Sequence, residues 1–554
     1  MTLRLAGSLS ALFVVLACDA ETDDTSKPLP NPSGGSTSGG GGEGAVGGDG
    51  GGGNGGLGGD GGAGAGTTGG GGDGAGAAGA GGGGQGACDS AGPVVEENAS
   101  KTKYLLKGTI LVPSGPLVGE LLVDGNTITC VAASCSGAPG AAGATVVDTN
   151  GVIAPGLIDG HNHILFNIFD ADDWTPMQAY GNSGQWPNED RYGAMVDTKQ
   201  WLEGQGNSPV ELECELDKYG ETKALIAGTT SVQASAGSNS CYASVARTID
   251  TSSNGLPDDN MQTSTLFPST SSADGVCANF ADGDTTAYVI HVAEGVDLTA
   301  RNQFDTLETI STVDGCLYDA KTTIIHGTAL DPTRLAEMGQ IGMGLVWSPQ
   351  SNVFLYGANT DLTKTTDIPT ALAEGITVAI APDWSLGGSQ NMLDELRFAD
   401  VVDNAEWGDI LTPRELFEMG TINAAEVLAV DQYLGSIVVG KRADLAVFLP
   451  LEADPYETIL AATPRDVTMV FVDGRLLYGD ADLSGIAPSN AITEDLDVCC
   501  RAKFLGIGIT GGANKLNQTF AEIQTILSDE LAAYDALDFS EWDFWPLTPV
   551  VKCP

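Results

Sequence analysis

The four histidines of this chain all stand at the ends of short apolar runs that are typical of β-strands. His161 and His163 form a His-x-His pair after VIAPGLID, His291 follows AYVI, and His326 follows TTII. A lone aspartate, Asp383, ends a further run, TVAIAP. In a strand, residues i and i+2 point to the same face, so the imidazoles of His161 and His163 can coordinate one ion together. Histidines that are so few and so placed predict a single metal site.

Strand-like runs alternate with stretches long enough for a helix over the middle of the chain. The runs are GTTSVQ, QTSTLF, AYVIHVAE, TTIIHG, GLVWSP and TVAIAPD. This alternation predicts an α/β fold, with a TIM-like (β/α)8 barrel over 153–431. Thr412-Pro413-Arg414-Glu415 forms a capping box with proline in the first turn, which predicts a helix packed outside the late barrel.

The segments on either side of the barrel alternate apolar and polar residues as paired strands do. YLLKGTILV and GELLVDGNTITCV precede the barrel, and ADLAVFLPL and VTMVFVDGRLLYGD follow it. We therefore expect residues 101–152 and 432–490 to meet in one small β-sandwich domain. The remaining segment, 491–554, has isoleucines and leucines at helical spacing and is expected to be a helical tail.

The first 18 residues resemble a bacterial lipoprotein signal. Arg4 precedes about ten apolar residues, and Val15-Leu16-Ala17-Cys18 has the form of a lipobox, which would leave Cys18 to carry a lipid. Plain secretion and a buried structural segment are the alternatives. Residues 19–100 contain a glycine-rich stretch without a strict three-residue period, so a flexible linker is expected. We expect an exported protein of the bacterial cell envelope, periplasmic or at the surface, that meets a membrane only through this lipid.

The net charge narrows the classes of molecule that the chain can bind. The chain has 24 lysines and arginines against 73 acidic residues, a formal charge of −49 that repels nucleic acid and anionic membranes. A small-molecule substrate is the partner that remains.

The even set of ten cysteines beyond residue 18 is typical of disulfides in an exported chain. Cys130 and Cys135 are the expected local bridge, and Cys553 is expected to pair with Cys499 or Cys500.

Five motifs, in this order, resemble the amidohydrolase superfamily in its imidazolonepropionase, cytosine deaminase and triazine hydrolase-like branch. They are PGLIDGHNH, IHVAEG, IHG, SPQSN and the late aspartate. The resemblance covers about residues 103–480. It implies hydrolysis of a non-peptide carbon–nitrogen bond in a small cyclic amide or amidine, by attack of a metal-bound hydroxide.

The resemblance implies four ligands for one divalent cation: His161, His163, His291 and Asp383. Zinc is the first choice, with iron or manganese as alternatives. Many relatives hold a second ion through a lysine, a glutamate or a cysteine on the fourth strand. Here no lysine lies between Lys223 and Lys321, and no glutamate between Glu221 and Glu294. We therefore expect one ion, and a disulfide role for the cysteines of this region, which favours the deaminase-like branch.

The resemblance also implies roles for the other polar groups. Glu294, three residues after His291, would shuttle a proton to the substrate nitrogen, and Asp383 would accept the proton of the attacking water. His326 would steady the oxygen or amino group at the reacting carbon, and Asn352 would touch the substrate. The plainer alternatives are a solvated rim acid for Glu294, a helix cap for Asp383, a core histidine for His326 and a turn-former for Asn352.

Two features separate this chain from the family pattern. Pro382 stands where relatives usually carry a small or hydroxyl residue, and Trp384 is expected to crowd the pocket. Substrates of the family are therefore not transferred to this chain, and a metallo-dipeptidase or a non-catalytic surface binding protein remain as alternatives. A group of aromatic residues after the first strand is expected to pack an added flap, with a planar-substrate pocket as the alternative: Phe166, Phe169, Trp174, Tyr180, Trp186, Tyr192 and Trp201.

Overall fold

The structure is a computed structural model, and it describes residues 91–234, 241, 244–251, 253–257 and 261–553. The predicted signal, the lipid site at Cys18 and the linker up to residue 90 lie outside the described residues. Within the described part, none of the helices combines the length and the apolar character needed to cross a bilayer.

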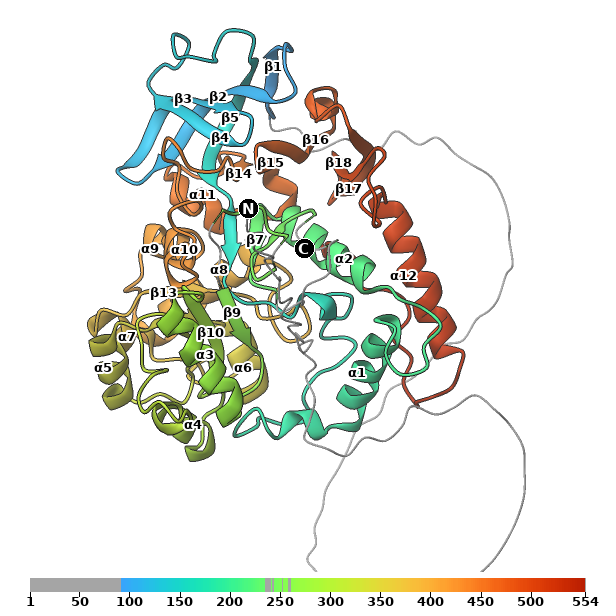
Figure 1. Cartoon of the computed structure of the whole chain (residues 1–554). Coiled ribbons are helices and arrows are strands. Elements are labelled where there is room, and N and C mark those ends of the chain that lie inside the picture. Colours follow the sequence, from blue (N-terminus) through green and yellow to red (C-terminus); the bar gives the residue numbers. More distant parts are fainter. Residues whose placement is uncertain (1–90, 235–240, 242–243, 252, 258–260, 554) are drawn as a thin grey trace, which may run out of the picture. The chain divides into compact units, whose positions relative to one another are not determined.

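Eight short parallel strands, β6 to β13, form the barrel of the described region. Figure 1 labels β7, β9, β10 and β13 among them. The eight strands form two sheets, in the orders β6-β7-β8 and β13-β12-β11-β10-β9. A parallel bridge between Asn162 and Asp383 connects the first sheet to the second. Every strand expected from the sequence is present, and the two-residue β8 was not expected because so short a run carries no pattern. The strands are β6 Leu157–Asp159, β7 Thr229–Val232, β8 Arg247–Thr248, β9 Met261–Ser264, β10 Ala287–Val292, β11 Thr322–His326, β12 Gly344–Trp347 and β13 Val378–Ile380.

Helices alternate with these strands, as expected for a (β/α)8 barrel. The capping box at Thr412 is present: its side chain accepts from the backbone N–H of Glu415 at the start of α9. Helices α1 and α2 belong to the long connection between β6 and β7. The helices of the barrel region are α1 Asp190–Leu202, α2 Glu213–Leu225, α3 Thr270–Asp282, α4 Leu298–Thr309, α5 Pro332–Ile341, α6 Pro349–Tyr356, α7 Ile368–Ala373, α8 Met392–Val402, α9 Pro413–Met419 and α10 Ile422–Val427.

The two flanks of the barrel meet in one ten-stranded sheet, as the alternating segments predicted. The central contact is antiparallel pairing of β14 with β5, in which Leu445 lies opposite Pro155. Tyr104 from one flank and Phe471 from the other pack edge to face in the shared core, with ring centroids 5.1 Å apart. The strands before the barrel are β1 Val94–Glu97, β2 Lys103–Val112, β3 Gly115–Asp124, β4 Thr127–Ala132 and β5 Thr145–Pro155; those after it are β14 Leu445–Phe448, β15 Val467–Val472 and β16 Arg475–Asp480, with helix α11 Pro455–Ala461 after β14.

Two expected boundaries change. The segment 491–554 is not purely helical, because it begins with strands β17 Ala491–Val498 and β18 Arg501–Ile509, which extend the ten-stranded sheet through β16. Its helix, α12 Phe520–Asp535, lies within the expected helical run. The expected linker also ends earlier, because β1 pairs antiparallel with β5. Neither change was expected, because β1 is only four residues long and the helical spacing of later residues dominated the segment 491–554.

Residues 544–553 pack against the loop that follows β6. The backbone N–H of Thr548 donates to the carbonyl of Ile168 at 3.3 Å. The Thr548 hydroxyl donates to Oδ2 of Asp170 at 3.1 Å, and Nζ of Lys552 lies 2.7 Å from the same oxygen. A disulfide then joins Cys553 to Cys499 on the ten-stranded sheet. This segment therefore ties the loop to the sheet.

The expected local disulfide, Cys130 with Cys135, is present. Of the two expected partners of Cys553, the structure selects Cys499, and Cys500 is an exposed free thiol. Two further bridges join Cys214 to Cys241 and Cys277 to Cys316.

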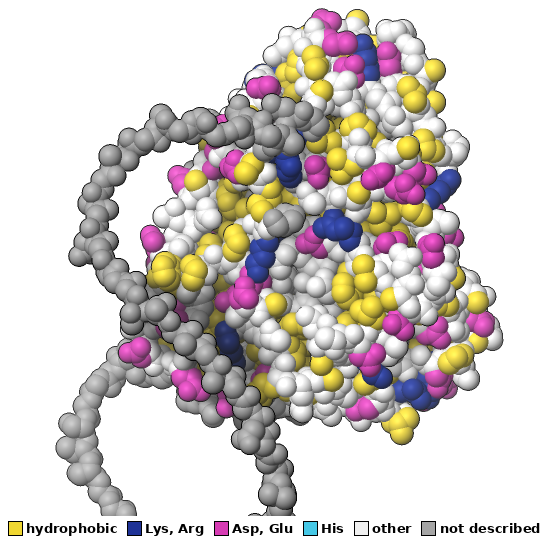
Figure 2. Space-filling view, turned by 180° about the vertical axis from the view of Figure 1, so that it is seen from behind, with side chains coloured by type: hydrophobic (Ala, Val, Ile, Leu, Met, Phe, Trp, Pro, Cys, Tyr) yellow, Lys and Arg dark blue, Asp and Glu magenta, His cyan; other side chains and the backbone are white. Residues whose placement is uncertain are grey.

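The acidic side chains are spread over the face of the molecule that Figure 2 shows. Figure 2 shows Asp and Glu side chains scattered over the visible face, without one dominant patch. Such a face offers no broad basic surface to a polyanion, in keeping with the formal charge of −49.

Candidate active site

Four residues at the strand ends gather their ligand atoms within 4.8 Å of one another: His161, His291, His326 and Asp383. All four side chains are buried. Nε2 of His161 lies 3.1 Å from Oδ1 of Asp383 and 3.1 Å from Nε2 of His291. Ligands about 2.0–2.1 Å from a tetrahedral cation stand roughly 3.3 Å from one another, so these separations suit a shared ion.

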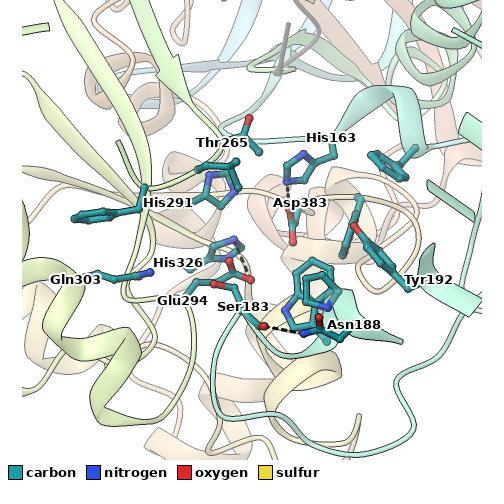
Figure 3. Close-up of a pocket in the computed structure, with 17 residues that line it drawn as sticks. His163, Ser183, Asn188, Tyr192, Thr265, His291, Glu294, Gln303, His326 and Asp383 are labelled. Carbon is teal, nitrogen blue, oxygen red and sulfur yellow. Dashed lines mark hydrogen bonds and ion pairs between the residues drawn. The ribbon is translucent and has the colours of Figure 1, made fainter. Parts of the chain in front are cut away.

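His163 lies beside this group and lines the cavity. Its Nε2 is 3.5 Å from Oδ1 of Asp383, and 16% of its side chain is exposed. The tight cluster thus contains His326, which was expected to act on the substrate, whereas His163, expected to be a ligand, stands at its edge. Figure 3 shows His163, His291 and His326 around the cavity. The ring centroid of His161 lies 4.8 Å from that of His163, 4.5 Å from His291 and 5.9 Å from His326, so all four predicted histidines converge.

The hydrogen bonds behind His161 indicate that a cation belongs between these groups. Nε2 of Gln233 donates to Asp250 at 3.1 Å, which turns Oε1 of Gln233 toward Nδ1 of His161, 2.9 Å away. His161 must therefore carry a proton on Nδ1, which leaves Nε2 to face the Asp383 carboxylate. A nitrogen lone pair and a carboxylate that face each other repel unless a positive charge lies between them: either a proton, held there as a hydrogen bond to Asp383, or a metal ion in its place.

The backbone places the ligands at the carboxyl ends of the strands. His161 and His163 follow β6, His291 lies in β10, and His326 ends β11. His326 and Asp383 adopt left-handed backbone conformations, with φ of 67° and 71°. Such conformations cost roughly 1–3 kcal/mol and are retained where function requires them.

Burial and neighbouring charge set the protonation of the cluster. Burial lowers the pKa of His163 to about 3 and holds the pKa of His291 well below its usual value, so both imidazoles stay neutral and can donate lone pairs. Burial opposes the charged form of Asp383, but its hydrogen bond with His161 and the nearby imidazoles outweigh this and lower its pKa. One carboxylate and several imidazoles form a donor set suited to a divalent ion.

Glu294 enters the cavity next to His326. Its Oε1 lies 4.0 Å from Nε2 of His326 and accepts a hydrogen bond from the hydroxyl of Tyr356 at 2.7 Å. Trp186 donates in turn to that hydroxyl at 3.4 Å. Burial raises the pKa of Glu294, which suits a group that takes and returns a proton.

The prediction for Asn352 is not supported by its position. SPQSN forms the N-cap and first turn of helix α6, and Asn352 is fully buried, with its amide within 3.4 Å of the hydroxyls of Thr365 and Thr366. It does not line the cavity. Successive helical residues point about 100° apart, so the neighbouring Ser351 faces the site instead and donates to Oδ2 of Asp383 at 2.6 Å.

Sequence reasoning missed Gln233, Ser351 and Tyr356, which hold His161, Asp383 and Glu294. Gln233 follows β7 as the last letter of the GTTSVQ run, so its place at a strand end was a usable signal. No signal in the sequence pointed to Ser351 or Tyr356, because their contacts depend on the orientation of α6.

The cluster opens into a cavity of about 500 Å³. The aromatic residues after β6 divide between two roles: Phe166, Trp186 and Tyr192 line the cavity, whereas Trp174 and Phe169 are buried in the core. Packing was the expected role for all of them, and it holds only for part of the group.

Trp384 narrows the cavity from the side of Asp383, as expected from its position in the sequence. It lines the cavity, and its ring centroid lies 5.5 Å from that of His163. The residue that follows the aspartate therefore forms part of the wall that a substrate would meet.

The fourth-strand region supplies no bridging ligand for a second ion among the described residues. Cys241 and Cys277, the two cysteines of this region, are both engaged in disulfides. The expectation of a single cation therefore stays a prediction that metal analysis can test.

Comparison with known proteins gives one consistent family. Residues 152–477 match the model of the amidohydrolase family. The chain is 23% identical over 407 residues to 5'-deoxyadenosine deaminase of Methanothermobacter thermautotrophicus, an alignment that covers 68% of this chain and 92% of the relative. It is 23% identical over 428 residues to 5-methylthioadenosine/S-adenosylhomocysteine deaminase of Moorella thermoacetica, covering 69% and 95%.

Solved structures show the same fold. A triazine hydrolase variant superposes with a TM-score of 0.52 at 17% identity, over 68% of this chain and 94% of the other. A mutant of atrazine chlorohydrolase from Arthrobacter aurescens, complexed with zinc and atraton, gives a TM-score of 0.51 at 16% identity, over 70% and 97%.

Proposed function

The chain belongs to the amidohydrolase family, and we propose that its site binds one zinc ion and hydrolyses the exocyclic carbon–nitrogen bond of a small cyclic amidine, releasing ammonia. The observation that carries this proposal is the convergence of His161, His291, His326 and Asp383 within 4.8 Å, with Glu294 beside them. The deaminase names of the two relatives that align over most of their length support the choice of bond.

The metal is expected to supply two things when bound: a water molecule with a lowered pKa, and polarisation of the reacting carbon. His161, His291, His326 and Asp383 would hold it, with His163 3.5 Å from Asp383 as a further ligand. Three or more imidazoles with one carboxylate favour zinc among the common divalent ions, although iron and manganese accept the same donors.

Two carboxylates beside the cluster would carry out the proton transfers, one transfer each. Asp383 is held by Ser351 through Oδ2, and its Oδ1 faces the imidazoles, where it can accept a proton from water. Glu294, held by Tyr356, can carry a proton to the leaving nitrogen. His326, which the geometry groups with the ligands, would hold the metal on the side next to Glu294. These steps balance as water plus an amidine giving a carbonyl and ammonia.

Ammonia release by the zinc-loaded protein tests the proposal directly. A panel of aminated triazines, pyrimidines and purines should contain at least one substrate. Glu294→Gln should lower kcat by roughly a hundredfold or more, because it removes the proton carrier while keeping the shape. Glu337→Gln, at an exposed position of α5, is the matched control and should leave kcat unchanged. Zinc binding without turnover of any member of a broad panel would instead favour a binding protein.

We propose as well that the protein is exported and carries a lipid on Cys18. The lipobox-like sequence and the disulfides among the described residues support an oxidising compartment. Cys18→Ala should move the protein from the membrane fraction to the soluble fraction. A wild-type chain that is already soluble, and carries no labelled fatty acid, would contradict the proposal.

A further inference from the structure

The cavity wall beyond the ligand cluster is largely aromatic. Trp384 is its centre: its ring centroid lies 5.6 Å from that of Trp186, 5.9 Å from Phe166 and 6.2 Å from Tyr192. All four side chains line the cavity, and Trp186 and Tyr192 come from the long connection after β6. Such rings bind flat, weakly hydrated molecules by stacking and by edge contacts.

The charged residues that line this cavity are acidic. Among the described residues, 17 line it; they include Glu294 and Asp383 but no lysine or arginine. Lys199 lies behind the wall, with Nζ 4.6 Å from the ring centroid of Phe166. It is buried and already paired with Glu203 at 2.8 Å. Away from the metal, an anionic substituent bound against the aromatic wall would therefore lose its water without gaining a lysine or arginine as a partner.

Gln303 supplies a neutral donor on the α4 side of the cavity. The backbone N–H of Ala293 donates to Oε1 of Gln303 at 2.9 Å, which fixes the orientation of the amide. The nitrogen end of Gln303 is then directed toward the cavity, as Figure 3 shows. An amide N–H there can bind a ring nitrogen or a carbonyl oxygen, but it cannot neutralise a carboxylate.

We propose that this cavity selects uncharged planar nitrogen heterocycles and excludes ligands that carry a carboxylate or a phosphate, with Gln303 as the position that sets this preference. The inference rests on the proposed function for the reacting end of the ligand. It adds that the rest of the ligand is neutral, flat and small enough to fit the cavity of about 500 Å³. A dipeptide, which bears a carboxylate, does not fit this description.

Matched pairs of ligands test the preference by binding alone. The zinc-loaded full chain is titrated with 5'-deoxyadenosine and adenosine 5'-monophosphate, and with melamine and its N-carboxymethyl derivative, while tryptophan fluorescence is followed. The neutral member of at least one pair should quench the emission and bind at least about tenfold more tightly than its anionic partner. Equal or tighter binding of the anionic members, or no binding of any member, would overturn the inference.

A charge introduced at Gln303 tests the assigned position. Gln303→Arg should reduce the neutral-to-anionic ratio of affinities by about tenfold, because it supplies the missing cation. Gln340→Arg adds the same charge at an exposed position of α5 and should leave the ratio unchanged. An unchanged ratio in Gln303→Arg, with zinc content and Tm preserved, would remove Gln303 from the proposal. Neutral ligands that bind without ammonia release would contradict the proposed function and leave the selectivity intact.

Discussion

The hydroxyl of Ser351 donates to Oδ2 of Asp383 at 2.6 Å, while Oδ1 of the same carboxylate lies 3.1 Å from Nε2 of His161. Helix α6 thereby fixes which oxygen faces the imidazoles. The same helix ends at Tyr356, whose hydroxyl holds Glu294. One short helix therefore positions both carboxylates that the proposed reaction uses.

Ser351→Ala should leave Asp383 free to rotate. We expect kcat to fall by roughly ten- to hundredfold, with a smaller change in KM, because a charge-assisted hydrogen bond contributes about 1.5–3 kcal/mol. Steady-state kinetics and zinc affinity are the measurements. Ser348→Ala is the control, since the buried hydroxyl of Ser348 makes no hydrogen bond to the described residues. Equal losses in the two variants would show that α6 packing, and not the bond to Asp383, is responsible.

Tyr356→Phe removes the hydrogen bond to Glu294 and keeps the ring. We expect kcat to fall by roughly tenfold and the pH profile of kcat to shift, because the pKa of Glu294 depends on this donor. Tyr104→Phe removes a buried hydroxyl from the ten-stranded sheet and should change stability only. A Tyr356→Phe enzyme with an unchanged pH profile would show that the hydroxyl does not act through Glu294.

Removal of the cation should weaken the fold around the cluster. Without it, only a proton can separate Nε2 of His161 from the Asp383 carboxylate, so chelation should lower Tm by roughly 5–10 °C, and added zinc should restore it. Elemental analysis should find one ion per chain. Two ions per chain would show that a ligand outside the described cluster takes part.

The titration of the buried Lys223 should make the free energy of unfolding depend on pH above neutrality. Burial lowers its pKa from 10.5 to about 7, and its ammonium group donates to the carbonyl of Asn167 at 3.3 Å. Between these two pKa values the unfolded chain holds a proton that the folded chain has released, so the contribution of Lys223 to stability rises with pH there and is smallest below pH 7.

Lys223→Met should therefore stabilise the fold most below pH 7. Its advantage over the wild type should shrink by up to about 1.4 kcal/mol per pH unit as the pH rises toward 10. Denaturant unfolding at several pH values measures the difference, and Lys364→Met controls for a lysine lost from the surface. An advantage that stays constant with pH would show that Lys223 is charged in the folded state across this range.

The sequence predicted most of the fold because its signals were local. Each barrel strand longer than two residues overlapped with a strand-like run, and the i, i+2 spacing of His161 and His163 already implied a shared face. The late strands β17 and β18 escaped notice because the following helix dominated the pattern of that segment.

The parts of the site that could not be predicted depend on orientation between elements. Asn352 and Ser351 are adjacent in the sequence, yet one helical step decides which of them meets Asp383. The pairing of Gln233 with His161 joins residues 72 positions apart. Such contacts follow from the way α6 and β7 pack, and no local pattern records them.

The anchoring of Asp170 has a consequence for biosynthesis. Thr548, which donates to Asp170, follows it by 378 residues, and Lys552 contacts the same carboxylate. While the chain emerges from the ribosome, the barrel strands are available long before these two residues are. The loop that follows β6 can therefore reach its final contacts only after these two residues have been synthesised. A nascent chain stalled before residue 548 would contain every ligand of the cluster, but Asp170 in this loop would lack its contacts with Thr548 and Lys552.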